Sequence, residues 1–138
     1  MLFDFCKTID KSEIVVLTHV TSPFLKKQTI LDAIDALQRN HKSKSIHSAH
    51  QIQDFVWLKE ASETVPINFF TDRVQRTQDL STILVSKGAF FIARAGDILD
   101  QESRLPEPLL FFPLDHIQAL EIDNFGDLEF ARILTRQS

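Results

Sequence analysis

The chain has 138 residues, of which 43% are hydrophobic and 25% charged, as in a soluble globular protein, and this length predicts one domain over residues 1–138. The net charge of −4 gives no basic surface for a nucleic acid, and no stretch approaches the roughly 20 apolar residues of a membrane helix. A single cysteine, Cys6, excludes an internal disulfide framework and fits a cytoplasmic location.

The first part of the chain reads as strand, helix and strand. Residues 13–20 form a short β-branched apolar run, typical of a strand buried on both faces, and Thr21-Ser22-Pro23 ends it in a turn. Residues 27–39 place apolar side chains on one helical face, and residues 44–49 predict a second strand. These elements predict a βαβ unit with a right-handed crossover.

The middle of the chain is more polar. Residues 51–68 predict an extended or hairpin-like segment, and residues 69–80 predict a loop or a short helix. Strand-like runs follow at residues 83–84 and 88–93.

In the last part of the chain, residues 96–99 are predicted to begin a short helix. An apolar run at residues 109–112 stops at Pro113, and a final helix is predicted from Phe125 to Thr135. The whole pattern predicts an α/β fold, in which ligands bind beyond the carboxyl ends of the strands. That rule directs attention to residues 19–23 and to Asp123.

Two pairs of polar residues are the first candidates for chemistry. The hydroxyls of Thr21 and Ser22 could contact a base, a ribose or a sugar, or they could cap the following helix. Glu121 and Asp123 alternate along an extended segment, so both carboxylates face one way and could bind Mg²⁺. The alternative is a solvated acidic face before a helix N-terminus.

Further candidates are weaker. Arg76 and Gln78 could recognise a carboxylate or a phosphate, or they could belong to a solvated loop. Phe111 and Phe112 are core residues or the wall of an apolar sub-pocket. Three histidines lie close together in the sequence: His41, His47 and His50. A metal site would also require a matching cysteine or carboxylate motif, and none accompanies them.

Read in order, several segments resemble the acylneuraminate cytidylyltransferases, enzymes that activate sialic-acid-like sugars as CMP conjugates. Thr21-Ser22-Pro23 resembles the family's threonine-serine-proline segment, and residues 119–128 resemble its aspartate-rich segment before the closing helix. The resemblance runs from about residue 13 to residue 136 and matches only the C-terminal half of the family. The other matching segments lie at residues 43–49, 78–80 and 88–92.

The resemblance implies a fold and a reaction. It implies a Rossmann-like, mostly parallel sheet with flanking helices, in which the family's N-terminal strands and their CTP-binding loop are missing. It implies CTP and an acidic sugar as ligands, Mg²⁺ as cofactor, and CMP-sugar and pyrophosphate as products. It also implies a homodimer, and the open edge of the strand at residues 13–20 predicts self-association.

The family's functional positions map onto this chain residue by residue. Asp123 matches the second aspartate of the metal-binding pair and is the implied catalytic residue, and Glu121 replaces the first. The implied substrate-binding residues are His19, Thr21, Ser22, Arg76, Gln78, Phe91, Phe111 and Phe112.

The resemblance leaves open whether the chain is an enzyme. One hypothesis is a nucleotidyltransferase that forms a CMP-sugar. A second is a non-catalytic sugar-binding or dimer-partner module that lacks the nucleotide loop, and the family's residues are replaced at His19, Thr77 and Lys87, which favours it. A third is an α/β domain whose motifs are purely structural.

Overall fold

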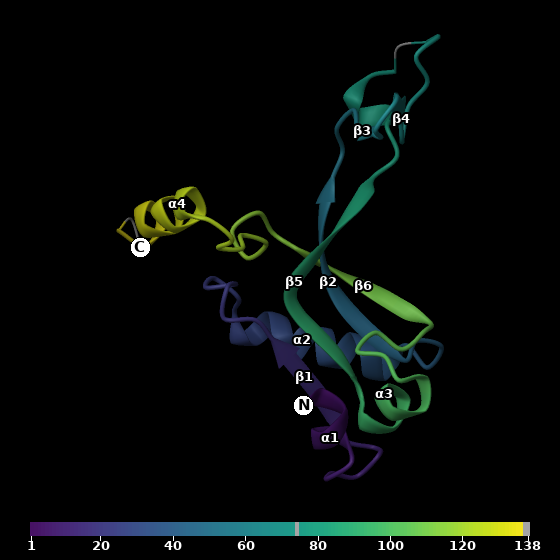
Figure 1. Cartoon of the computed structure of the whole chain (residues 1–138), viewed down its shortest axis with the longest axis vertical. Helices are drawn as coiled ribbons and strands as arrows, with labels where there is room; N and C mark the ends of the chain where they lie inside the picture. The colour runs from purple at the N-terminus through teal and green to yellow at the C-terminus, as the bar shows by residue number, and fades with distance from the viewer. Residues whose placement is uncertain (74, 137–138) are drawn as a thin grey trace. The chain divides into compact units, whose positions relative to one another are not determined.

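A computed structural model describes residues 1–73 and 75–136 of the chain (Figure 1). The chain forms two compact units. The sheet unit comprises residues 1–50 and the chain from residue 86 onward, and the hairpin unit comprises residues 51–85. The prediction of a single domain over residues 1–138 stays a prediction.

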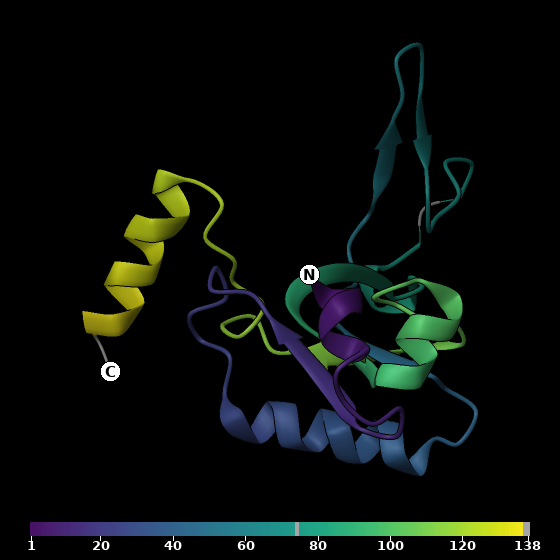
Figure 2. The same cartoon turned by 60° about the horizontal axis from the view of Figure 1, so that its bottom comes forward.

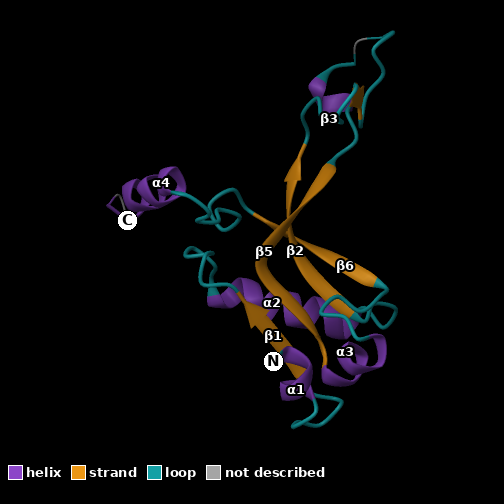
Figure 3. Ribbon diagram, viewed as in Figure 1, coloured by secondary structure: helices purple, strands orange, loops and turns teal. Residues whose placement is uncertain are grey.

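A four-stranded sheet organises the sheet unit, with strand order β1-β5-β2-β6 (Figure 3). The strands are β1 (Ile14–Thr18), β5 (Ile83–Arg94), β2 (Ser45–Ile52) and β6 (Leu109–Leu114). The predicted α/β class is confirmed. The sheet is mixed, with less parallel pairing than predicted, because β2 pairs with β6 in parallel while β1 pairs with β5 antiparallel.

Strand β1 lies at an edge of the sheet and is shorter than the predicted run. The strands β1 and β2 of the predicted βαβ unit are not neighbours, because β5 lies between them. β5 comes from much later in the chain, so the local pattern of residues 13–49 gives no indication that it lies between β1 and β2.

Helix α2 (Lys27–Arg39) covers one face of the sheet and has the predicted bounds. Its residues Ala33 and Leu37 are fully buried and pack in one cluster with Phe90 of β5. Burying a leucine or phenylalanine side chain stabilises a fold by about 1.5–3 kcal/mol. The apolar spacing that predicted the helix is therefore also what attaches it to the sheet.

Helices α1 (Leu2–Cys6) and α3 (Ala95–Gln101) cover the opposite face near one end of the sheet (Figure 2). Cys6 and Ile98 join Val15 of β1 in a second apolar cluster. α3 begins directly after β5 and ends at Glu102, whose φ of 49° is left-handed. Sequence analysis expected the start of α3 but not α1.

The hairpin unit contains β3 (Trp57–Lys59) and β4 (Thr64–Pro66), which pair antiparallel as the predicted hairpin. The Phe69 ring packs edge-on against Trp57, with 4.9 Å between the centroids. The Asn68 side chain donates to the carbonyls of Asp54 and Ser81 and accepts the Val56 N–H. A short 3₁₀ helix at Thr77–Asp79 matches the predicted loop or short helix.

Helix α4 (Phe125–Arg136) closes the described chain, as predicted. The Asp127 carboxylate accepts the N–H groups of Asp123 and Asn124, and Asn124 Oδ1 accepts the Asp127 N–H. These reciprocal bonds satisfy backbone donors that a helix N-terminus leaves without partners. Among residues 1–73 and 75–136, no helix has the length and apolar character that crossing a membrane requires.

Candidate functional site

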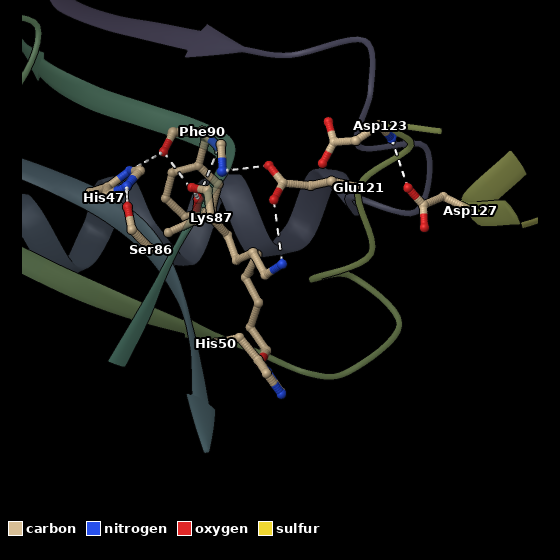
Figure 4. Close-up of polar contacts among 11 residues, drawn as sticks. His47, His50, Ser86, Lys87, Phe90, Glu121, Asp123 and Asp127 are labelled. Carbon is tan, nitrogen blue, oxygen red and sulfur yellow. Dashed lines mark hydrogen bonds and ion pairs between the residues drawn. The ribbon is translucent and has the colours of Figure 1, made fainter. Parts of the chain in front are cut away.

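Three separate segments meet beyond the end of β1, and we call this place the β1-end site: His19, Thr21, Gly88, Phe91 and Glu121. The Ile122 N–H donates to the Thr21 carbonyl at 2.8 Å, and this bond joins the segment before α4 to the turn after β1. Glu121 Oε1 accepts the Gly88 N–H at 2.6 Å, which joins the same segment to β5 (Figure 4). Residues flagged from distant parts of the sequence therefore lie together.

Gly88 makes this close approach possible. A Cβ atom at this position would lie 2.8 Å from Glu121 Oε1 and 3.0 Å from His19 Nδ1. A separation below 3.0 Å forces a shift of the neighbour. The missing side chain therefore lets the Glu121 carboxylate and the His19 ring both lie against β5.

The two predicted metal ligands differ in their surroundings. Glu121 is mostly buried, and besides the Gly88 N–H it pairs with Lys87 Nζ at 3.4 Å. Asp123 is exposed, and its backbone N–H donates to Asp127 (Figure 4). In the described part of the chain, no group of three or more His, Cys, Asp or Glu side chains could hold a metal ion.

Asp123 fits a Mg²⁺ ion that takes most of its ligands from phosphate oxygens and water, since such an ion needs only one or two protein carboxylates. Glu121 does not fit the same role as it stands, because each of its oxygens already has a protein partner. In this structure Glu121 holds the segment before α4 against β5, and neither of its oxygens is free to bind a metal.

The hydroxyls predicted to contact substrate are not equally available. Ser22 is buried, and its Oγ has no hydrogen-bond partner in the described structure. Thr21 is half-buried and contributes its carbonyl to Ile122. His19 is half-buried, and its ring centroid lies 5.5 Å from that of Phe91.

Phe111 and Phe112 of β6 face opposite sides of the sheet, as neighbours on a strand do. Phe112 packs against the core cluster, with its centroid 6.0 Å from that of Phe90. Phe111 is 38% exposed, and its centroid lies 6.1 Å from that of His47. Of this pair, only Phe111 has the exposure that a pocket wall requires.

Arg76 and Gln78 belong to the hairpin unit, not to the sheet unit that carries the other predicted residues. Arg76 is paired with Asp79, with 2.9 Å between Nε and Oδ2. Gln78 is exposed, and its carbonyl accepts a hydrogen bond from Gln53.

His47 is a residue that sequence reasoning left without a role. It is 2% exposed and stacks on Phe91, with 4.4 Å between centroids. Its Nδ1 contacts the Phe90 carbonyl at 3.1 Å, and its Nε2 contacts Ser86 Oγ (Figure 4). A carbonyl only accepts, so Nδ1 carries the proton, and in the neutral ring Nε2 accepts from the Ser86 hydroxyl.

Burial is the main cause that lowers the pKa of His47. The hydrogen bond to Phe90 opposes this shift, as does the charge of Glu121, while the charges of Arg104 and His19 lower the pKa further. The alternation of side chains along the strand at residues 44–49 was the one available signal that His47 faces away from Ile46 and the core.

Arg104 is the second residue that sequence reasoning missed. Its guanidinium carbon lies 4.6 Å from the centroid of the Phe91 ring. It follows α3 in a connecting segment, where no periodic pattern indicates which way a side chain faces.

Comparison with known proteins shows the fold and no closer relationship. No family model matches the chain, and no curated protein matches it. A 4-diphosphocytidyl-2C-methyl-D-erythritol synthase from Anaerococcus prevotii superposes with a TM-score of 0.59 at 16% identity, covering 97% of this chain and 64% of that one. A 2-C-methyl-D-erythritol 4-phosphate cytidylyltransferase from Thermus thermophilus gives 0.58 at 14% identity, with 98% and 67% covered.

Another 4-diphosphocytidyl-2C-methyl-D-erythritol synthase gives a TM-score of 0.61 at 13% identity, covering 97% of this chain and 63% of that one. This chain therefore spans somewhat under two thirds of the length of two of these three structures. The fold is that of the cytidylyltransferases in this group, which agrees with the coarse form of the predicted resemblance. Membership of the acylneuraminate family stays a prediction.

The lowered pKa of His47 predicts a pH dependence of folding stability. In the unfolded chain the ring titrates near its ordinary value of 6.5, while the buried ring titrates lower. Below pH 6.5 the unfolded state therefore binds a proton that the folded state does not, so stability falls as the pH drops through this range. His47→Gln should remove that part of the fall.

Urea unfolding of the wild type and the variant, measured from neutral to mildly acidic pH, checks this expectation. His41→Gln is the matched control, because His41 is exposed in a loop and should leave the pH slope unchanged. Equal slopes for wild type and His47→Gln would show that His47 titrates alike in both states.

Proposed function

We propose that the sheet unit carries part of the active site of a CTP-dependent nucleotidyltransferase that joins CMP to an acidic, sialic-acid-like sugar. The observation that carries this proposal is the β1-end site, where the turn after β1 meets the segment holding Glu121 and Asp123. The fold likeness to cytidylyltransferases supports it. The choice of an acidic sugar depends on the resemblance of the sequence motifs.

In the proposed reaction a sugar hydroxyl attacks the α-phosphorus of CTP. A new phosphorus–oxygen bond forms to the sugar, the bond to the β-phosphate oxygen breaks, and pyrophosphate leaves while the hydroxyl loses its proton. A Mg²⁺ ion held by Asp123 would neutralise charge developing on the phosphates. Glu121, fixed by Gly88 and Lys87, would hold the segment that places Asp123.

The other residues of the site would bind and orient the ligands. Phe111, which is 38% exposed, offers an apolar surface for a sugar ring, whereas Phe91 is buried and supports the side chains of His47 and Arg104. His19 and Thr21, both half-buried, offer polar groups in the turn after β1. Arg76 and Gln78 belong to the hairpin unit, and the proposed site of the sheet unit does not include them; Arg76 is paired with Asp79. Holding two reactants in one geometry is the main catalytic task in such a reaction.

The ion pair of Glu121 favours a second candidate function, a non-catalytic sugar-binding or dimer-partner module. With Glu121 occupied by Lys87, the site offers one carboxylate to a metal, where the related sequence pattern has two. Binding of the sugar needs neither that second ligand nor CTP.

A calorimetric titration with CTP, with and without Mg²⁺, tests the proposed reaction. Wild-type protein should bind CTP only with Mg²⁺, and Asp123→Ala should weaken that binding about tenfold or more because the metal loses its protein carboxylate. Asp35→Ala is the matched control, since Asp35 is an exposed aspartate on α2. Absence of binding at millimolar CTP would reject the enzyme and leave the sugar-binding module.

The open edge of β1 supports self-association as a further part of the proposal. Among the described strands, β1 pairs only with β5, and Val16 in the middle of β1 is 36% exposed. A groove lined by Phe5, Ile9 and Ile14 among others adjoins this strand. Unpaired N–H and C=O groups along an edge favour pairing with the same strand of a second copy.

Val16→Lys should prevent this pairing, because a charged side chain on an edge strand disfavours strand addition. Sedimentation velocity over a concentration series should show a dimer for the wild type and a monomer for the variant. Leu31→Lys is the control, since Leu31 is an exposed apolar residue on α2. A wild-type chain that stays monomeric at high concentration would contradict the edge model.

A further inference from the structure

Arg104 of the sheet unit is held by an aromatic ring, as Arg73 of the hairpin unit is held over Phe70 at 4.9 Å. Its guanidinium lies over the Phe91 ring at 4.6 Å, within the distance at which a cation is attracted to an aromatic face. No described residue accepts a hydrogen bond from Arg104 or forms an ion pair with it. Arg39 and Arg76, in contrast, are each bound to a nearby aspartate.

The surface beneath Arg104 is rigid. Phe91 is 6% exposed and stacks on His47, which hydrogen bonds hold to Phe90 and Ser86. A guanidinium that rests on a fixed ring keeps its N–H groups free at its edge. Because the side chain is partly ordered before a ligand arrives, binding costs less conformational entropy.

Glu121, the carboxylate of the β1-end site, already has protein partners for both of its oxygens, the Gly88 N–H and Lys87. The charge of Arg104 instead acts on His47, whose pKa it lowers after the larger effect of burial. The guanidinium over Phe91 therefore forms no ion pair with a protein carboxylate in the described structure.

We propose that Arg104 binds the carboxylate of a small organic acid over Phe91, and is a specificity-determining residue of the site. The planar fork of a guanidinium matches a carboxylate with two parallel hydrogen bonds. Phe91, buried beneath Arg104, and the exposed Phe111 both contact the His47 ring, and Phe111 offers apolar contact for the rest of the ligand. This inference rests on the proposed function for the acidic sugar as ligand, and it assigns the carboxylate contact to Arg104 instead of Arg76.

The test is a binding titration of N-acetylneuraminate, without CTP, followed by the amide signals of the ¹⁵N-labelled full chain. Arg104→Met should weaken binding about tenfold or more, and Arg104→Lys should weaken it severalfold because a lysine keeps the charge but loses the fork. Arg39→Met is the matched control and should bind like the wild type, because Arg39 is an exposed arginine on α2, while Arg76→Met tests the residue suggested by the sequence. Arg104 is exposed, so its variants should fold normally, and the amide spectra check this directly.

Changes to the ligand separate the carboxylate from other chemistry. The uncharged methyl ester of N-acetylneuraminate should bind the wild type as weakly as the acid binds Arg104→Met. Inorganic phosphate should compete weakly; strong competition would mean a phosphate site and would overturn the assignment to a carboxylate. The assignment is also overturned if the ester binds as tightly as the acid, if only Arg76→Met loses binding, or if wild-type protein does not bind N-acetylneuraminate.

These outcomes are independent of nucleotide chemistry. A chain that binds the acid through Arg104 but never binds CTP would keep this inference and reject nucleotidyl transfer. A chain that binds CTP with Mg²⁺ but binds the acid equally well without Arg104 would keep the proposed reaction and reject this inference.

Discussion

The structure of the sheet unit depends on the insertion of β5 between β1 and β2. One side of this strand supplies Phe90 and Ile92 to the core under α2. Phe91, between them, faces the other way and forms the floor of the candidate site. Gly88 in the same strand allows Glu121 to bond to its backbone, so one strand determines both the packing and the site.

The sequence predicted the elements that depend on local pattern. The bounds of α2 and the position of α4 follow from apolar spacing, and both were confirmed. The edge position of β1 and its antiparallel pairing with β5 were not predicted, because they depend on a strand about 70 residues later in the chain. The five-residue helix α1 was missed because so short a segment has little periodicity.

The candidate site shows the same division. His19, Thr21 and Glu121 were selected from motifs in two distant segments, and the fold brings them to one end of β1. His47 and Arg104 were missed, since their significance comes only from contact with the Phe91 ring. Ser22 illustrates the reverse case, because a hydroxyl that looked available in sequence is buried in the fold.

A shared fold does not fix a reaction, because one fold supports many functions through different sites. The likeness to cytidylyltransferases is at 13–16% identity and covers 63–67% of those chains, so the substrate has to be argued from residues. The central claim is that the turn after β1, the middle of β5 and the segment before α4 form one ligand site.

The most direct test of that claim is to map amide chemical-shift changes while CTP with Mg²⁺, and then N-acetylneuraminate, are added to the chain. The account predicts that the changes concentrate at Thr21, Gly88, Phe91 and Ile122 and leave the exposed face of α2 unaffected. Changes confined to other surfaces, or no changes with either ligand, would contradict it.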